Sequence, residues 1–88
     1  MNYDWYFVFN HVAFAAEELV SRTVRLNLEG IGEKEILITV GNYIGLTYEG
    51  VLLYANMEDR NPFSMDGYAI YVKDDGDVYL GIEVADAG

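Results

Sequence analysis

Side chains that could carry out nucleophilic or acid–base chemistry are scarce in this sequence. His11 is the only histidine, and the chain contains no cysteine. A hydroxyl nucleophile would need His11 beside Ser21 or Ser64, and no spacing in the sequence indicates such a pair. Gly30 and Gly32 lack the later glycine and the following helix of a phosphate-binding loop. We therefore expect that the protein is not an enzyme and binds no cofactor.

Carboxylates are abundant, and three of them cluster around one glycine. The segment 73–77 holds Asp74, Asp75 and Asp77 beside Gly76. Oxygen-rich turns can bind Ca²⁺, but a glycine falls where the calcium-binding pattern places its third-position ligand. No carboxylate pair is marked by an apolar setting that would raise a pKa for hydrolysis. We therefore read this turn as solvated and expect no metal site.

The charge balance is the strongest signal in the composition. Fifteen Asp and Glu residues face five Lys and Arg residues, which gives a formal net charge of −10. Binding to nucleic acid or to anionic membranes requires cationic side chains, so both are disfavoured. A basic protein partner is favoured, because complementary potentials speed encounter and select partners. Solubility or salt adaptation is the alternative interpretation of the same charge.

Most of the carboxylates lie in segments that are expected to be loops. If the hairpin turns at 29–35 and 73–77 gather at one end of a sheet, they form a rigid negative surface. Such a surface can occupy a groove built for phosphates, and its rigidity lowers the ordering cost of binding. The candidate partner-binding residues are Glu29, Glu33, Glu35, Glu58, Asp59, Asp66, Asp74, Asp75 and Asp77.

Length and composition predict one folded domain over residues 1–88. The chain is 52% hydrophobic and 15% aromatic, which is enough for one modest core and too much for a disordered segment. The absence of cysteine fits a reducing compartment. The N-terminus lacks the basic start of a signal peptide, and no apolar run is long enough to span a bilayer. We therefore expect a soluble, cytoplasmic protein.

The segment 35–56 is expected to supply the central strands of the fold. It is rich in Ile, Val, Leu, Thr and Tyr, and glycines interrupt it at short intervals. A loop over 41–43 places Val40 opposite Ile44 and keeps the apolar sets on one face. At Gly50 two alternatives remain open. The chain either turns there or continues as one long strand that bends.

Two further hairpins follow from alternation. Residues 23–40 alternate apolar with polar side chains around a glycine-containing turn, which predicts the first hairpin. In the last hairpin a loop over 74–76 places Gly where positive φ is needed and sets Val72 opposite Val78. These patterns predict antiparallel pairing between strands adjacent in sequence.

The N-terminal third is expected to form a strand and then a helix. Residues 3–9 alternate as a strand whose aromatic face is expected in the core or at an interface. That face consists of Tyr3, Trp5, Phe7 and Phe9. Residues 11–22 are rich in Ala, Glu and Leu and are predicted to form the only helix, capped by Asn10. The irregular segment 57–66 is read as a functional loop or as a pinned surface loop.

The expected fold class is α+β: a small, strongly bent antiparallel sheet or open barrel of about five to seven strands with one helix near residues 11–22. We expect an inhibitor or binding protein that blocks a basic, nucleic-acid-handling protein. Phage anti-defence proteins and immunity proteins share this nucleic-acid-mimic profile, by analogy only. One alternative is a homo-oligomeric β module joined through residues 3–9 or an edge strand. Another is a pocket that sequesters a small ligand, lined by Trp5, Tyr6 and Tyr54.

Overall fold

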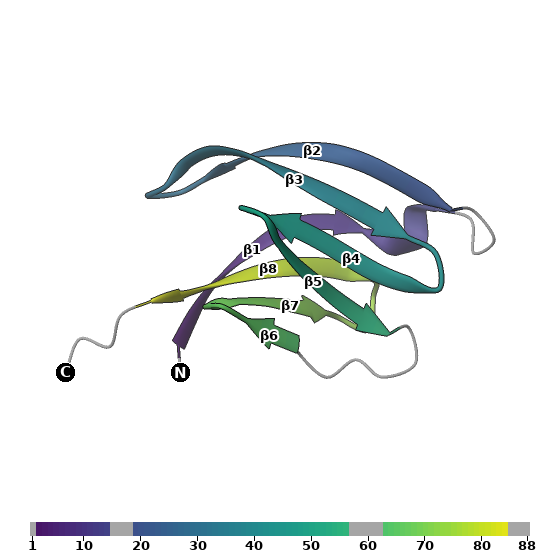
Figure 1. Cartoon of the computed structure of the whole chain (residues 1–88). Coiled ribbons are helices and arrows are strands. Elements are labelled where there is room, and N and C mark those ends of the chain that lie inside the picture. The colour runs from purple at the N-terminus through teal and green to yellow at the C-terminus, as the bar shows by residue number, and fades with distance from the viewer. Residues whose placement is uncertain (1, 15–18, 57–62, 85–88) are drawn as a thin grey trace.

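The computed structural model describes residues 2–14, 19–56 and 63–84. These residues form two four-stranded antiparallel sheets, which pack as the two layers of an open sandwich (Figure 1). The first sheet has the strand order β1-β8-β7-β6 and the second has the order β2-β3-β4-β5. The strands of the first sheet are β1 (Asn2–Asn10), β6 (Phe63–Met65), β7 (Tyr68–Val72) and β8 (Asp77–Val84). Those of the second are β2 (Val20–Leu28), β3 (Gly32–Val40), β4 (Tyr43–Tyr48) and β5 (Val51–Asn56).

The predicted α+β class and the helix over 11–22 are wrong. The described residues contain no α-helix, and only His11–Ala13 forms a single 3₁₀ turn, η1. β2 already begins at Val20, which pairs with Val40 of β3. Helix propensity is a weak prior, and pairing along β3 overrides it here. Residues 15–18 of the predicted helix lie outside the described part of the chain.

The predicted hairpin registers are confirmed. Gly50 has a φ of 79°, and Glu49 beside it is also left-handed, so the chain turns there. The alternative, one long strand that bends at Gly50, is therefore wrong. The predicted pairs Val40 with Ile44 and Val72 with Val78 are confirmed. The same hairpins pair Ile38 with Leu46, Tyr48 with Val51, and Tyr71 with Tyr79.

The hydrophobic core lies between the two sheets. Strand alternation buries one face of each sheet, and the most deeply buried side chains come from both layers. They include Ile36, Leu46 and Leu53 of the second sheet and Ile70 and Leu80 of the first. The predicted loop 57–66 contributes the short edge strand β6 at its end, and its residues 57–62 lie outside the described segments. None of the described segments forms a helix suited to crossing a membrane.

On the first strand, Trp5 and Phe7 point away from the core, whereas Phe9 points into it. Tyr6 and Val8 point toward the core, whereas Trp5 and Phe7 are 43% and 49% exposed. Phe9 is buried because a β-bulge interrupts the β1–β8 register between Phe7 and Phe9. The expectation that this aromatic face lies in the core is therefore correct for Phe9 and wrong for Trp5 and Phe7, and the interface alternative stays a prediction.

Candidate functional site

The outer surface of the first sheet carries a group of aromatic side chains from three neighbouring strands. We call this group the aromatic face; it consists of Tyr3, Trp5, Phe7, Tyr71 and Tyr79. The Trp5 ring centroid lies 5.5 Å from that of Tyr3 and 5.9 Å from that of Tyr71. The Phe7 ring lies 5.8 Å from Tyr79. Large aromatic side chains left on a surface in one contiguous group are typical of an interaction site.

A glycine allows the indole ring to lie across the sheet. Gly81 of β8 is the cross-strand partner of Trp5. A Cβ atom at Gly81 would lie 2.6 Å from Cζ3 of Trp5, so a side chain there would displace the ring. With glycine in place, Trp5 covers the β8 backbone and reaches Tyr71 on β7. The rings are thus held on a sheet rather than on a loop.

A shallow basin of about 410 Å³ lies within the aromatic face. Its lining is formed by Trp5, Tyr71, Lys73 and Tyr79. The Lys73 ammonium lies 5.7 Å from the Tyr79 ring centroid, within the range of a cation–π interaction. The walls of the basin therefore favour flat or cationic groups over anions.

Carboxylates lie at both ends of the aromatic face. At one end, Asp74 and Asp75 are exposed in the β7–β8 turn, and Asp77 is half-buried at the start of β8. At the other end, Glu83 lies opposite Tyr3. Asp66, in the β6–β7 turn, lies beside Glu83 along a shallow groove. The aromatic centre is thus bordered by negative charge along the direction of the strands.

Hydrogen bonds fix the β7–β8 turn against β1. The Asn10 side-chain amide donates to Oδ1 of Asp77 at 2.9 Å and to the backbone carbonyl of Asp75 at 3.1 Å. Oδ1 of Asp75 accepts from the Asp77 backbone N–H at 3.1 Å. Gly76 has a φ of 95° and donates its N–H to the Lys73 carbonyl, which closes the turn. These contacts hold the turn's backbone and the Asp75 and Asp77 carboxylates in place.

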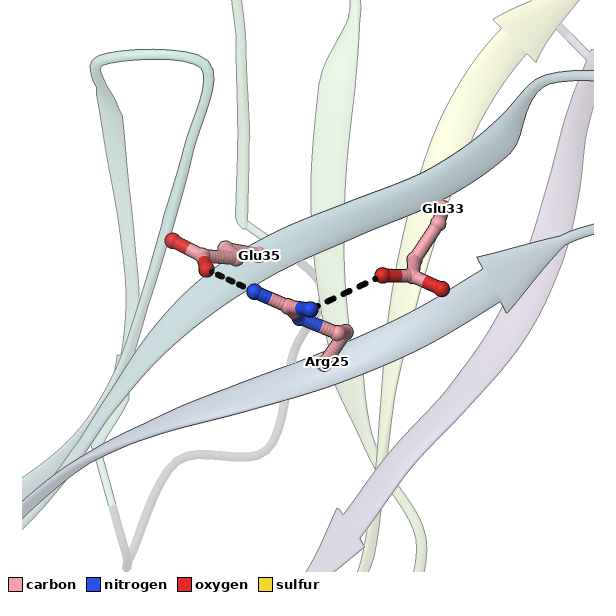
Figure 2. Close-up of polar contacts among 3 residues, drawn as sticks. All are labelled: Arg25, Glu33 and Glu35. Carbon is pink, nitrogen blue, oxygen red and sulfur yellow. Dashed lines mark hydrogen bonds and ion pairs between the residues drawn. The ribbon is translucent and has the colours of Figure 1, made fainter.

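The other acidic turn connects β2 and β3. The β2–β3 turn and the β7–β8 turn are at opposite ends of the molecule (Figure 1). Glu33 and Glu35 both pair with Arg25, with N–O distances of 3.1 and 2.7 Å (Figure 2). These exposed ion pairs contribute little stability, but they reduce the local negative charge. The expectation that the two turns gather at one end of a sheet is therefore wrong.

The nine candidate partner-binding residues thus separate into three groups. Asp66, Asp74, Asp75 and Asp77 border the aromatic face. Glu29, Glu33 and Glu35 lie on the β2–β3 hairpin, and of these Glu29 lines a shallow groove with Trp5 and Tyr6. Glu58 and Asp59 lie outside the described residues. Sequence reasoning named Tyr3, Trp5 and Phe7 as part of a core or interface face, and it missed Tyr71, Tyr79 and Glu83. The register that sets Val72 opposite Val78 also sets Tyr71 opposite Tyr79, and this was the available signal, since both tyrosines alternate with core residues and must therefore point outward.

The pocket predicted from Trp5, Tyr6 and Tyr54 does not form. Trp5 lies on the outer face of the first sheet, and Tyr54 lies on the outer face of the second. Tyr54 instead helps to line a separate shallow basin of about 470 Å³, together with Tyr43 and Leu52. The Tyr43 and Tyr54 ring centroids are 6.2 Å apart. The second sheet therefore carries its own aromatic patch, in which Tyr43 and Tyr54 are neighbours.

Two groups near the β4–β5 turn have shifted pKa values. Burial raises the pKa of Tyr48 above its ordinary value near 10.0, and the Glu49 carboxylate adds to this rise. Lys34 Nζ lies 2.8 Å from Oε1 of Glu49, and this hydrogen-bonded pair raises the pKa of Lys34. Both shifts are upward, so both protonated forms are favoured in the folded state.

We expect the free energy of unfolding to fall as the pH rises above about 10. In the unfolded chain Tyr48 loses its proton at its ordinary pKa, while in the folded protein it keeps the proton to higher pH. The unfolded state then binds fewer protons, so stability decreases with pH through this window. Lys34 acts in the same direction. Urea denaturation at a series of alkaline pH values measures this loss. Tyr48→Phe should lose less stability across the window than the unmodified protein, and an equal loss in both would contradict the assignment.

The remaining chemistry of the site is limited. Among the residues that the structure describes, no group of three or more His, Asp or Glu side chains could hold a metal ion. Comparisons of the chain with protein-family models, with curated proteins and with solved structures find no match. The aromatic face and its bordering carboxylates are therefore the basis for assigning a function.

Proposed function

We propose that this chain is a small acidic inhibitor that docks on a basic, nucleic-acid-handling protein and blocks it. The observation that carries the proposal is the exposed aromatic face with carboxylates at both of its ends. Aromatic side chains are enriched at the centres of protein interfaces, where a few of them carry most of the binding energy. Charges at the rim speed encounter and select the partner.

The net charge of −10 indicates the class of partner. Proteins that handle nucleic acid carry clustered cations that bind phosphates. A negatively charged surface is attracted to such clusters over distances of about one Debye length. The rings of the aromatic face project from strands, and Asn10 holds the β7–β8 turn. Binding therefore requires little ordering of the inhibitor.

Two matched variants test the proposal, each of which removes three negative charges. The Asp-turn variant carries Asp74→Asn, Asp75→Asn and Asp77→Asn. The Glu-hairpin variant carries Glu33→Gln and Glu35→Gln in β3 and Glu49→Gln in the β4–β5 turn, all on the second sheet. Asparagine keeps the acceptor oxygens that the turn uses, so the Asp-turn variant should fold. The two variants have the same net charge and differ in whether the lost charge borders the aromatic face.

The measurement is capture from a cell lysate at low salt, elution with rising salt, and mass spectrometry. We expect basic proteins to bind and to elute as screening increases. The Asp-turn variant should bind them about tenfold more weakly, since three rim charges at about 0.5 kcal/mol each give that factor. The Glu-hairpin variant should bind nearly as well as the unmodified chain. Equal losses in both variants, or capture that resists salt, would contradict the proposal.

A homo-oligomeric β module is the second candidate function. It is favoured by two long edge strands, β1 and β2, and by exposed aromatic side chains on both sheets. Unpaired strand edges and exposed apolar patches are common sites of self-association. Light scattering distinguishes the candidates, because a mass near 9.9 kDa at high concentration would remove this one.

A further inference from the structure

One wall of the basin in the aromatic face already carries a cation from the chain itself. The Lys73 ammonium lies over the Tyr79 ring, and Trp5 and Tyr71 complete the lining. The faces of aromatic rings carry partial negative charge, which attracts cations. Asp74 and Asp75 follow Lys73 directly in the chain and add to the same negative potential. The local environment is thus suited to a positively charged side chain.

We propose that this basin receives an arginine side chain of the basic partner, which takes the place of the Lys73 ammonium over the Tyr79 ring. The inference rests on the proposed function and names the group that the partner presents. Arginine fits better than lysine, because its planar guanidinium stacks on rings and also forms paired hydrogen bonds with carboxylates. An arginine in the basin would place neighbouring cations of a basic segment near the β7–β8 turn.

Lys73 then acts as an internal competitor for the basin. Its removal should strengthen binding of an arginine-containing ligand, because the site is vacated and a like charge is lost. An exposed cation–π interaction corresponds to a change of about two- to fivefold in affinity. Loss of one positive charge raises affinity for any cation, so a matched control is needed. Arg22 serves this purpose, since it is exposed, lies over Phe14 and is not part of the basin lining.

The probe is a short oligo-arginine peptide, and its oligo-citrulline counterpart is the neutral control of nearly the same shape. Trp5 is the only tryptophan and lines the basin, so its fluorescence reports binding directly. We expect a saturable fluorescence change with the arginine peptide and none with the citrulline peptide. Lys73→Ala should tighten binding about two- to fivefold, and Arg22→Ala should change it less.

Changes to the walls of the basin complete the test. Tyr71→Leu should weaken arginine-peptide binding about fivefold, whereas Tyr71→Phe keeps the ring and should bind like the unmodified chain. Tyr54→Leu, in the separate basin of the second sheet, should have no effect. Circular dichroism checks that each variant folds. If Tyr71→Leu does not fold, the proposal is still tested by the other two variants, since Tyr71→Phe should bind like the unmodified chain and Lys73→Ala should bind more tightly.

The outcomes separate this inference from the proposed function. Equal binding of the citrulline peptide would overturn it, because stacking without charge would then suffice. Arginine-peptide binding that is lost in the Asp-turn variant but unchanged by Tyr71→Leu and Lys73→Ala would also overturn it. In that case the acidic docking function would stand without the basin. No binding of the arginine peptide at low salt would overturn the inference, and the lysate capture would decide the function separately.

Discussion

Replacing Leu53 with alanine should lower the free energy of unfolding by about 2–5 kcal/mol, whereas the same replacement at Leu52 should cost less than about 1 kcal/mol. The two residues are neighbours on β5 and have the same side chain. Leu53 is fully buried opposite Leu46, and Leu52 is 46% exposed on the outer face of the second sheet. The first replacement leaves a cavity in the core, and the second removes partly hydrated atoms.

Urea denaturation of the two variants measures this difference. A larger loss of stability for Leu52→Ala would mean that β5 faces the other way. A similar loss for both variants would mean that the two side chains are equally buried, which would also contradict the structure. A one-residue slip in register exchanges the two faces of a strand, so the outward position of Tyr54 would then also be incorrect. An unchanged dependence of the unfolding free energy on urea concentration would show that both variants unfold from the same kind of native state.

The hairpins could be predicted because their determinants are local. Alternation fixes which side chains share a face, and a glycine with positive φ fixes the turn. Gly50 and Gly76 both adopt positive φ, with values of 79° and 95°. Each lies within a few residues of the strands that it connects, so a short stretch of sequence contained the information needed for both.

The helix over 11–22 was wrong because its signals, the Ala, Glu and Leu content and the Asn10 cap, were all local. Ala, Glu and Leu favour a helix in an isolated peptide, but a strand that pairs along β3 gains hydrogen bonds and burial. Val20 is buried opposite Val40, and Ser21 pairs with Thr39. Nothing within residues 11–22 reveals that β3 lacks a partner on that side. The fold class changed from α+β to a sandwich for this reason.

The aromatic face depends on contacts between residues far apart in the chain. Trp5 meets Tyr71 only because β8 lies between β1 and β7. The β-bulge turns Phe9 inward while Phe7 stays outward, and the alternation of side chains along residues 3–9 does not reveal it. Gly81 makes room for the indole, yet a glycine within a strand does not say which side chain covers it. Strand order was therefore the missing information, and it also separated the two acidic turns.

Blocking of the partner is the largest functional effect that we expect. If the aromatic face and its carboxylates occupy the surface that binds phosphates, inhibitor and nucleic acid cannot be bound at the same time. Once this chain fills more than half of the partner's binding sites, the partner's apparent affinity for nucleic acid should fall in proportion to the concentration of the chain. The Asp-turn variant should need about tenfold more protein for the same effect, as in the capture experiment.

The most direct test starts from labelled nucleic acid bound to the captured partner. This chain is then added in increasing amounts, and fluorescence anisotropy reports how much nucleic acid stays bound. We predict that the unmodified chain and the Glu-hairpin variant release the nucleic acid completely, and that the Asp-turn variant does so only at higher concentration. A stable complex that holds partner, nucleic acid and inhibitor together at saturation would contradict the account.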